Sequence, residues 1–155
     1  MSLSSVLAKL VPGFGVASGK CGDARFPSGT IAMQLPYFEQ FGLKLKGYYQ
    51  GTLNLDISPY DFELLNPDYS FNSVRWSTDL PAENFSFFSC RLKKANAYSN
   101  SSYNGFVYWP HPSTKPEFHQ NLSVLEVVAP FIPNLSYGSM LELTTSSKII
   151  RFTKF

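Results

Sequence analysis

The segment Thr52-Leu53-Asn54-Leu55-Asp56-Ile57 contains the clearest periodicity in the chain, because polar and apolar residues alternate at every position. Successive side chains of a β-strand point to opposite faces of the sheet, so this alternation predicts a strand with one buried face. The apolar side chains then enter the core, and the side chains of Thr52, Asn54 and Asp56 all point to the other side.

The composition of the 155-residue chain favours a single mainly β domain spanning residues 1–155. Apolar residues make up 44%, aromatic residues 16% and charged residues 15%, which excludes wholesale disorder and a coiled coil. The 10 glycines and 11 prolines are spread along the chain without a period, as expected for strands joined by tight turns. A chain of this length buries roughly two thirds of its unfolded surface, so it requires neither disulfides nor a structural metal.

The same patterns divide the rest of the chain into expected elements. A short helix is expected over residues 37–41, because Pro36 favours a helix start and Gly42 a helix end. Residues 59–83 are expected to form a long irregular stretch, and residues 1–14 a loose N-terminal segment. Further strands are expected over residues 31–35, 85–92, 106–109 and 124–129, and over 140–144 and 148–152, which would pair as a hairpin. Six or seven strands with one short helix and long loops predict a small β-barrel.

The net charge of +2 is too small for a protein that binds nucleic acid by releasing counterions. Basic residues nevertheless gather in the first third of the chain. Residues 1–50 contain five basic residues but only two acidic ones. The basic residues are Lys9, Lys20, Arg25, Lys44 and Lys46, and the acidic residues are Asp23 and Glu39. This excess predicts a local site for an anionic ligand.

The two cysteines, Cys21 and Cys90, lie far apart and lack the spacing of zinc or thioredoxin motifs. We therefore expect free thiols in a reducing compartment. The apolar residues near the N-terminus are too few for a membrane span and make a poor signal peptide. The sequence predicts a cytoplasmic protein with neither a membrane nor a nucleic acid as partner.

A glycine-containing turn, Ser18-Gly19-Lys20-Cys21-Gly22-Asp23, is the first candidate for a binding site. Glycine lets backbone N–H groups approach a phosphate closely, and Lys20 and Arg25 would add positive charge. The turn matches neither the Walker loop nor the dinucleotide-binding fingerprint. An ordinary hairpin turn with solvated basic residues is the alternative.

Three polar side chains on the 52–57 strand and one carboxylate farther along the chain are the other candidates. Thr52, Asn54 and Asp56 offer oxygen ligands that suit Mg²⁺, or they simply form the solvent face of a strand. Glu126 interrupts the apolar run Val124-Leu125-Glu126-Val127-Val128-Ala129. It either faces water at a strand edge or serves hydrogen bonding to a ligand or proton transfer.

Taken in order, these motifs resemble the archaeal-type CTP-dependent riboflavin kinase family. The resemblance rests on Val16-Ala17-Ser18-Gly19 with its glycine turn, on Gly51-Thr52-Leu53-Asn54-Leu55, and on Leu125-Glu126-Val127-Val128-Ala129-Pro130. It extends over residues 15–152. It implies a six-stranded cradle-loop β-barrel that transfers the γ-phosphoryl group of CTP to the 5′-hydroxyl of riboflavin, giving FMN.

The resemblance also implies roles for individual residues. Thr52 and Asn54 would bind Mg²⁺, and Glu126 would hydrogen-bond the flavin. Phosphoryl transfer depends mostly on positioning and charge neutralisation, so a strong general base is not mandatory. Glu126 is the candidate catalytic residue, with Asp56 as the alternative base. Thr114 would contact the flavin phosphate. The nucleotide would be bound by two segments, Gly19, Lys20, Cys21, Gly22, Asp23 and Ala24 in the turn, and Phe131, Ile132, Pro133 and Asn134 after the apolar run.

The glycine turn departs from the family pattern, because Cys21 and Asp23 stand where the family has glycines. Two side chains in a phosphate cradle, one of them anionic, would hinder a triphosphate. This departure leaves the phosphate donor open, as CTP or another nucleotide. It also motivates a second hypothesis, a non-catalytic flavin- or nucleotide-binding module on the same barrel. A third hypothesis, which follows from the many aromatic residues, is a barrel that binds glycans or proteins.

Overall fold

The computed structural model describes residues 2–13, 29–95, 101–113 and 123–154, and within them the chain is mainly β. One helix, α1 (Thr30–Gln40), accompanies the strands. The strands are β1 (Leu3–Val11), β2 (Leu53–Asp56), β3 (Tyr60–Leu64), β4 (Tyr69–Val74), β5 (Glu83–Lys94), β6 (Tyr103–Pro110), β7 (Val124–Val128), β8 (Met140–Ser146) and β9 (Ile150–Lys154). The predicted mainly β class is confirmed.

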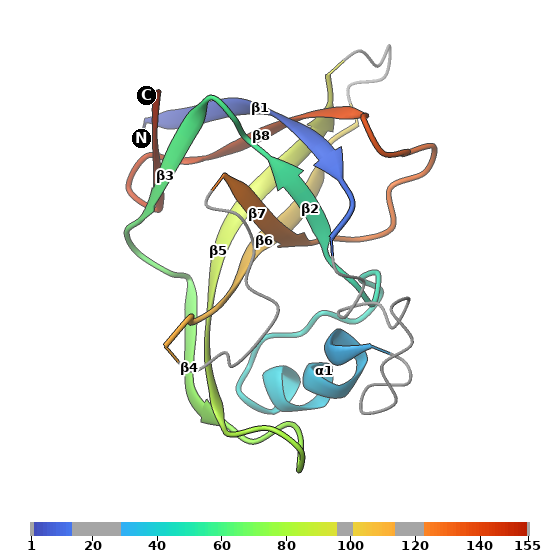
Figure 1. The fold of residues 1–155 in the computed structure, drawn as a ribbon, viewed down its shortest axis with the longest axis vertical. Coiled ribbons are helices and arrows are strands. Elements are labelled where there is room, and N and C mark those ends of the chain that lie inside the picture. The colour runs from blue at the N-terminus through green and yellow to red at the C-terminus, as the bar shows by residue number, and fades with distance from the viewer. Residues whose placement is uncertain (1, 14–28, 96–100, 114–122, 155) are drawn as a thin grey trace.

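Six antiparallel strands pair into a closed ring in the order β5-β6-β7-β2-β1-β8, because β8 also pairs with β5. β4 extends this sheet by pairing with the N-terminal half of β5. β3 and β9 form a separate two-stranded sheet. Figure 1 shows α1 below the ring, on the side where β4 and β5 extend beyond it. The ring places β2 between β1 and β7, which decides where the candidate site lies.

The N-terminal segment is a strand of the ring, so the prediction of a loose segment over residues 1–14 is wrong for Leu3–Val11. Val6, Ala8 and Leu10 alternate with exposed residues and are buried in the core. β1 also has a partner on each side, β2 and β8. A strand that is paired on both edges and buries one face is an integral part of a sheet.

The predicted strand over residues 31–35 is wrong as well, because these residues belong to α1. Ile31, Gln34 and Phe38 are all buried, and their spacing of three and four residues places them on one helix face. Pro36 lies inside the helix instead of starting it. Gly42, with a φ of +104°, follows the helix end as predicted.

Two other expectations about the strands are wrong. The stretch 59–83 was expected to be irregular, yet it contains β3 and β4. The last two strands do not pair as a hairpin, because β8 pairs with β1 and β5 whereas β9 pairs with β3. β4 pairs with the next strand along the chain, β5, whereas β8 and β9 have partners that are remote in sequence, β1 and β3.

The buried side chains form two clusters. One fills the ring, with Leu55, Leu143 and Val127 among its fully buried members. The other lies between α1 and the strands β4, β5 and β6, and is built around Phe38 and Phe87. Val128 of β7 belongs to the second cluster. Glu126 lies two residues from Val128 and on the same face of β7, so it is positioned where the ring meets the second cluster.

Candidate functional site

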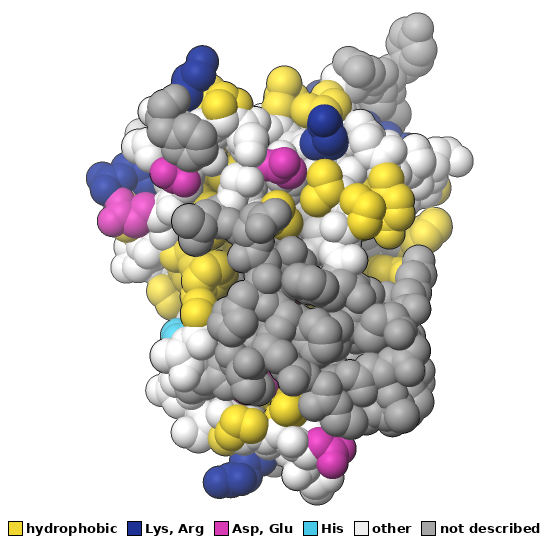
Figure 2. All heavy atoms as spheres, in the orientation of Figure 1, with side chains coloured by type: hydrophobic (Ala, Val, Ile, Leu, Met, Phe, Trp, Pro, Cys, Tyr) yellow, Lys and Arg dark blue, Asp and Glu magenta, His cyan; other side chains and the backbone are white. Residues whose placement is uncertain are grey.

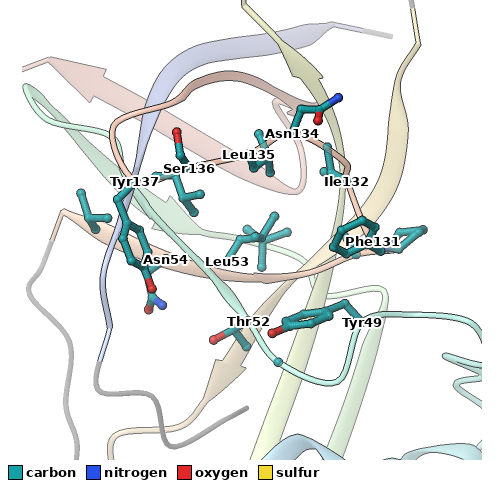
Figure 3. A pocket seen from close by; sticks show the side chains of 16 residues that line it. Tyr49, Thr52, Leu53, Asn54, Phe131, Ile132, Asn134, Leu135, Ser136 and Tyr137 are labelled. Carbon is teal, nitrogen blue, oxygen red and sulfur yellow. The ribbon is translucent and has the colours of Figure 1, made fainter. Parts of the chain in front are cut away.

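A cavity of about 420 Å³ lies at the ends of β1 and β2, under the segment that follows β7. Figure 2 shows hydrophobic side chains exposed on this part of the surface. Figure 3 shows the side chains that line the cavity, which come from segments far apart in the sequence. The lining residues are Leu10, Val11, Tyr49, Gly51, Thr52, Leu53, Asn54, Val127, Ala129, Pro130, Phe131, Ile132, Asn134, Leu135, Ser136 and Tyr137.

Thr52 and Asn54 line the cavity, and Glu126 lies next to them on the adjacent strand. Asn54 is directly opposite Glu126 in the antiparallel pairing of β2 with β7. The hydroxyl of Thr52 donates a hydrogen bond of 3.1 Å to Oε1 of Glu126. The alternation of β2 turns these polar side chains away from the buried Leu55. Three oxygen-bearing side chains thus meet on one face, although Glu126 is more than 70 positions from Thr52 and Asn54 in the sequence.

The third polar residue of the alternation, Asp56, has a different role. Its Oδ1 accepts hydrogen bonds from the backbone N–H of Ser58 at 2.9 Å and from the Ser58 hydroxyl at 2.7 Å. The backbone hydrogen bond is the main reason why the pKa of Asp56 is lowered, and Lys9, opposite it on β1, contributes. Asp56 closes the turn after β2, and it is not among the residues that line the cavity.

Gly13 packs directly against the Asn54 side chain. A Cβ atom on Gly13 would lie 2.4 Å from Nδ2 of Asn54, so any larger residue would displace that amide. The predicted nucleotide-binding residues Gly19, Lys20, Cys21, Gly22, Asp23 and Ala24 lie outside the described residues, as does Thr114. Gly13 is the last described residue before the glycine turn, and it contacts Asn54, a candidate metal ligand.

The segment after β7 closes the cavity from the other side. Phe131, Ile132 and Asn134 line the cavity, whereas Pro133, which was predicted with them, is not a lining residue. Asn134 has a φ of +62°, a left-handed conformation that asparagine tolerates better than most residues. The aromatic Tyr49 and Tyr137 are among the lining residues that the sequence does not predict, because exposed and buried aromatic residues look alike in a sequence.

Behind Glu126, a buried phenol connects β6 with α1. The hydroxyl of Tyr108 donates a hydrogen bond of 2.7 Å to Oε1 of Gln34. Burial raises the pKa of Tyr108 well above its usual value, and the charges of Glu126 and Glu83 raise it further. Tyr108 therefore stays neutral and remains a hydrogen-bond donor close to the Glu126 carboxylate.

A serine and a histidine also meet outside the cavity, in an arrangement that superficially resembles a nucleophile and its base. The hydroxyl of Ser86 lies 2.7 Å from Nε2 of His111 and 3.2 Å from the Ser70 hydroxyl. Burial lowers the pKa of His111. Ser86 is only 4% exposed, so its hydroxyl has no space beside it for a substrate. We interpret these residues as a polar link between β4, β5 and the residue that follows β6, with only the Ser86 side chain buried.

The oxygen-rich chemistry of Thr52, Asn54 and Glu126 fits Mg²⁺, which prefers oxygen ligands and keeps several waters. In the part of the chain that the structure describes, no group of three His, Cys, Asp or Glu side chains could hold a metal ion. A Mg²⁺ ion held by Thr52 and Asn54 would have the Glu126 carboxylate beside it. The only described helix, α1, is too short to cross a membrane.

Comparison with protein-family models, with curated proteins and with solved structures finds no match for this chain.

Proposed function

We propose that this protein is a riboflavin kinase-like phosphotransferase that moves a phosphoryl group from CTP, or another nucleotide, to the 5′-hydroxyl of riboflavin. One observation carries the proposal. The residues to which the resemblance gives roles in binding metal, flavin and nucleotide meet at a single cavity and its edge, namely Thr52 and Asn54, Glu126, and Phe131, Ile132 and Asn134. The closed ring of six strands agrees with the cradle-loop barrel that the sequence resemblance implies.

Thr52 and Asn54 are the proposed Mg²⁺ ligands. Bound there, the ion would neutralise the charge of the transferring phosphoryl group, which is the main requirement of this reaction class. Glu126 lies on the adjacent strand, and its hydrogen bond with Thr52 orients both side chains. The site thereby combines positioning groups with a carboxylate that can accept a proton.

Glu126 is the proposed catalytic base. The 5′-hydroxyl oxygen of riboflavin attacks the γ-phosphorus, and its proton passes to the Glu126 carboxylate. The new bond forms between that oxygen and the γ-phosphorus, while the bond from the γ-phosphorus to the bridging oxygen breaks and releases the nucleoside diphosphate. The neutral phenol of Tyr108 lies behind Glu126 and contributes no competing charge.

The direct test is to incubate the purified protein with riboflavin, Mg²⁺ and each nucleoside triphosphate, and to measure FMN. We expect FMN with at least one donor and a loss of at least about 100-fold in kcat for Asn54→Ala. Asn72→Ala is the matched control, because Asn72 is exposed on β4 and lies outside the cavity. Absence of FMN with every donor rejects the proposal, and full activity of Asn54→Ala rejects the metal site.

A non-catalytic flavin- or nucleotide-binding module is the second candidate. The apolar and aromatic lining of the cavity favours it, since such a lining supports binding whether or not transfer occurs. Quenching of riboflavin fluorescence by the protein, without FMN formation under any donor, would select this function over phosphoryl transfer.

A further inference from the structure

Three aromatic side chains at the cavity are exposed to solvent. The exposed fractions are 69% for Phe131, 65% for Tyr137 and 37% for Tyr49. Among the described residues, exposed large hydrophobic side chains are few, and these three line the same cavity. Apolar side chains that gather on the surface in this way mark a binding region more often than scattered ones do.

The rings of Tyr49 and Phe131 form an open corner. Their centroids are 6.5 Å apart, and their planes are inclined by 51°. Figure 3 shows these two rings on one side of the cavity and Tyr137 on the other, beside Asn54. A flat ring placed in this corner can stack on one aromatic side chain and meet the edge of the other, and both arrangements are favourable.

The rest of the cavity is divided between apolar and polar groups. Leu53 and Ile132 contribute apolar surface near the corner, and Thr52 and Asn54 contribute hydroxyl and amide groups. The volume of about 420 Å³ lies within the range of small-molecule sites. The lining therefore matches a ligand with a planar ring at one end and a polar chain at the other.

We propose that Tyr49 and Phe131 bind the planar heteroaromatic ring of the ligand, while Thr52 and Asn54 receive the hydroxylated or phosphorylated chain that the ring carries. This inference rests on the proposed function and deepens it by assigning a ring-binding end to the same cavity. A flavin and a nucleotide share this chemistry, so the experiment has to separate them.

The test replaces the Phe131 ring while keeping an apolar side chain. Phe131→Leu is compared with Phe41→Leu, which makes the same change at a residue that is 51% exposed and lies outside the cavity. The Kd of riboflavin is measured by flavin fluorescence, and the Kd of CTP by calorimetry. Tripolyphosphate with Mg²⁺ is the ring-free probe. Stacking on an aromatic side chain predicts a Kd at least about fivefold higher in Phe131→Leu, with no change for tripolyphosphate.

Weaker binding of riboflavin alone assigns the corner to the flavin, and weaker binding of CTP alone assigns it to the nucleobase. Unchanged affinity for both ligands, or equal weakening in Phe41→Leu, overturns the inference, as does a native protein that binds neither.

The two proposals fail in distinguishable ways. If Phe131→Leu forms FMN with native KM values for both substrates, the ring corner is refuted and the phosphotransferase stands. If the native protein forms no FMN but loses ring binding on Phe131→Leu, the phosphotransferase is refuted and the ring corner stands.

Discussion

Phe38 attaches α1 to the sheet, and its truncation should be among the most damaging single changes in the protein. The side chain is fully buried. Its ring centroid lies 5.1 Å from that of Phe85 and 5.0 Å from that of Phe87, both edge-on, and 6.0 Å from that of Phe71 in a stacked arrangement. Phe38→Ala would therefore leave a cavity at the centre of the second cluster.

Truncation of a buried phenylalanine costs about 3–5 kcal/mol. In a domain of this length each kcal/mol lowers the Tm by about 2–4 °C, so Phe38→Ala should lower it by roughly 6–20 °C. Phe41→Ala is the matched control. It removes the same ring at the C-terminal end of the same helix, but the Phe41 side chain is 51% exposed. Its ring contacts only Phe71 among the described ring pairs, at 5.3 Å, and such a contact contributes about 0.5–1.5 kcal/mol.

Urea unfolding measures the change in free energy and thermal unfolding measures the Tm, and both are followed by tryptophan fluorescence because Trp76 lies in the same cluster as Phe38. Phe38→Leu is a milder variant that keeps the measurement possible if Phe38→Ala does not fold. Its destabilisation should lie between those of the other two variants. Equal destabilisation by Phe38→Ala and Phe41→Ala would refute the docking of α1 through Phe38.

Three further outcomes are expected from individual residues. Gly105→Ala should destabilise the protein by about 1–3 kcal/mol in urea unfolding, because the new Cβ would lie 2.7 Å from the backbone oxygen of Val128; an unchanged midpoint would contradict this. Burial raises the pKa of Cys90 to about 12, so in a Cys21→Ser background Ellman's reagent should label Cys90 only after unfolding, and rapid labelling of the native protein would disprove it. Burial lowers the pKa of His111, so the unfolded chain binds a proton first and the free energy of unfolding should fall as the pH drops below about 6.5. His111→Gln should reduce this loss between pH 7.5 and 5.5, and identical slopes for both proteins would argue against it.

Part of the fold follows from patterns within single segments. The alternation in residues 52–57 correctly predicts β2, and the apolar run around Glu126 correctly predicts β7. The alternation also places Thr52 and Asn54 on one face, since side-chain direction in a strand is a local property of the backbone. The short apolar run at residues 31–35 was misread because its length and composition fit both a strand and a buried helix.

The candidate site itself required the tertiary structure. The pairing of β2 with β7 places Glu126 opposite Asn54, and no feature of either segment specifies that partner. The exposure of Tyr49 and Phe131 depends on which segments cover them. In the same way, Asp56 follows the same alternation as Asn54, but its carboxylate accepts a hydrogen bond from the backbone N–H of Ser58 and closes a turn. The sequence determined which side chains share a face of a strand, because that depends only on neighbouring residues. Strand partners and solvent exposure were decided by contacts between residues far apart in the chain, and only the folded protein brings these together.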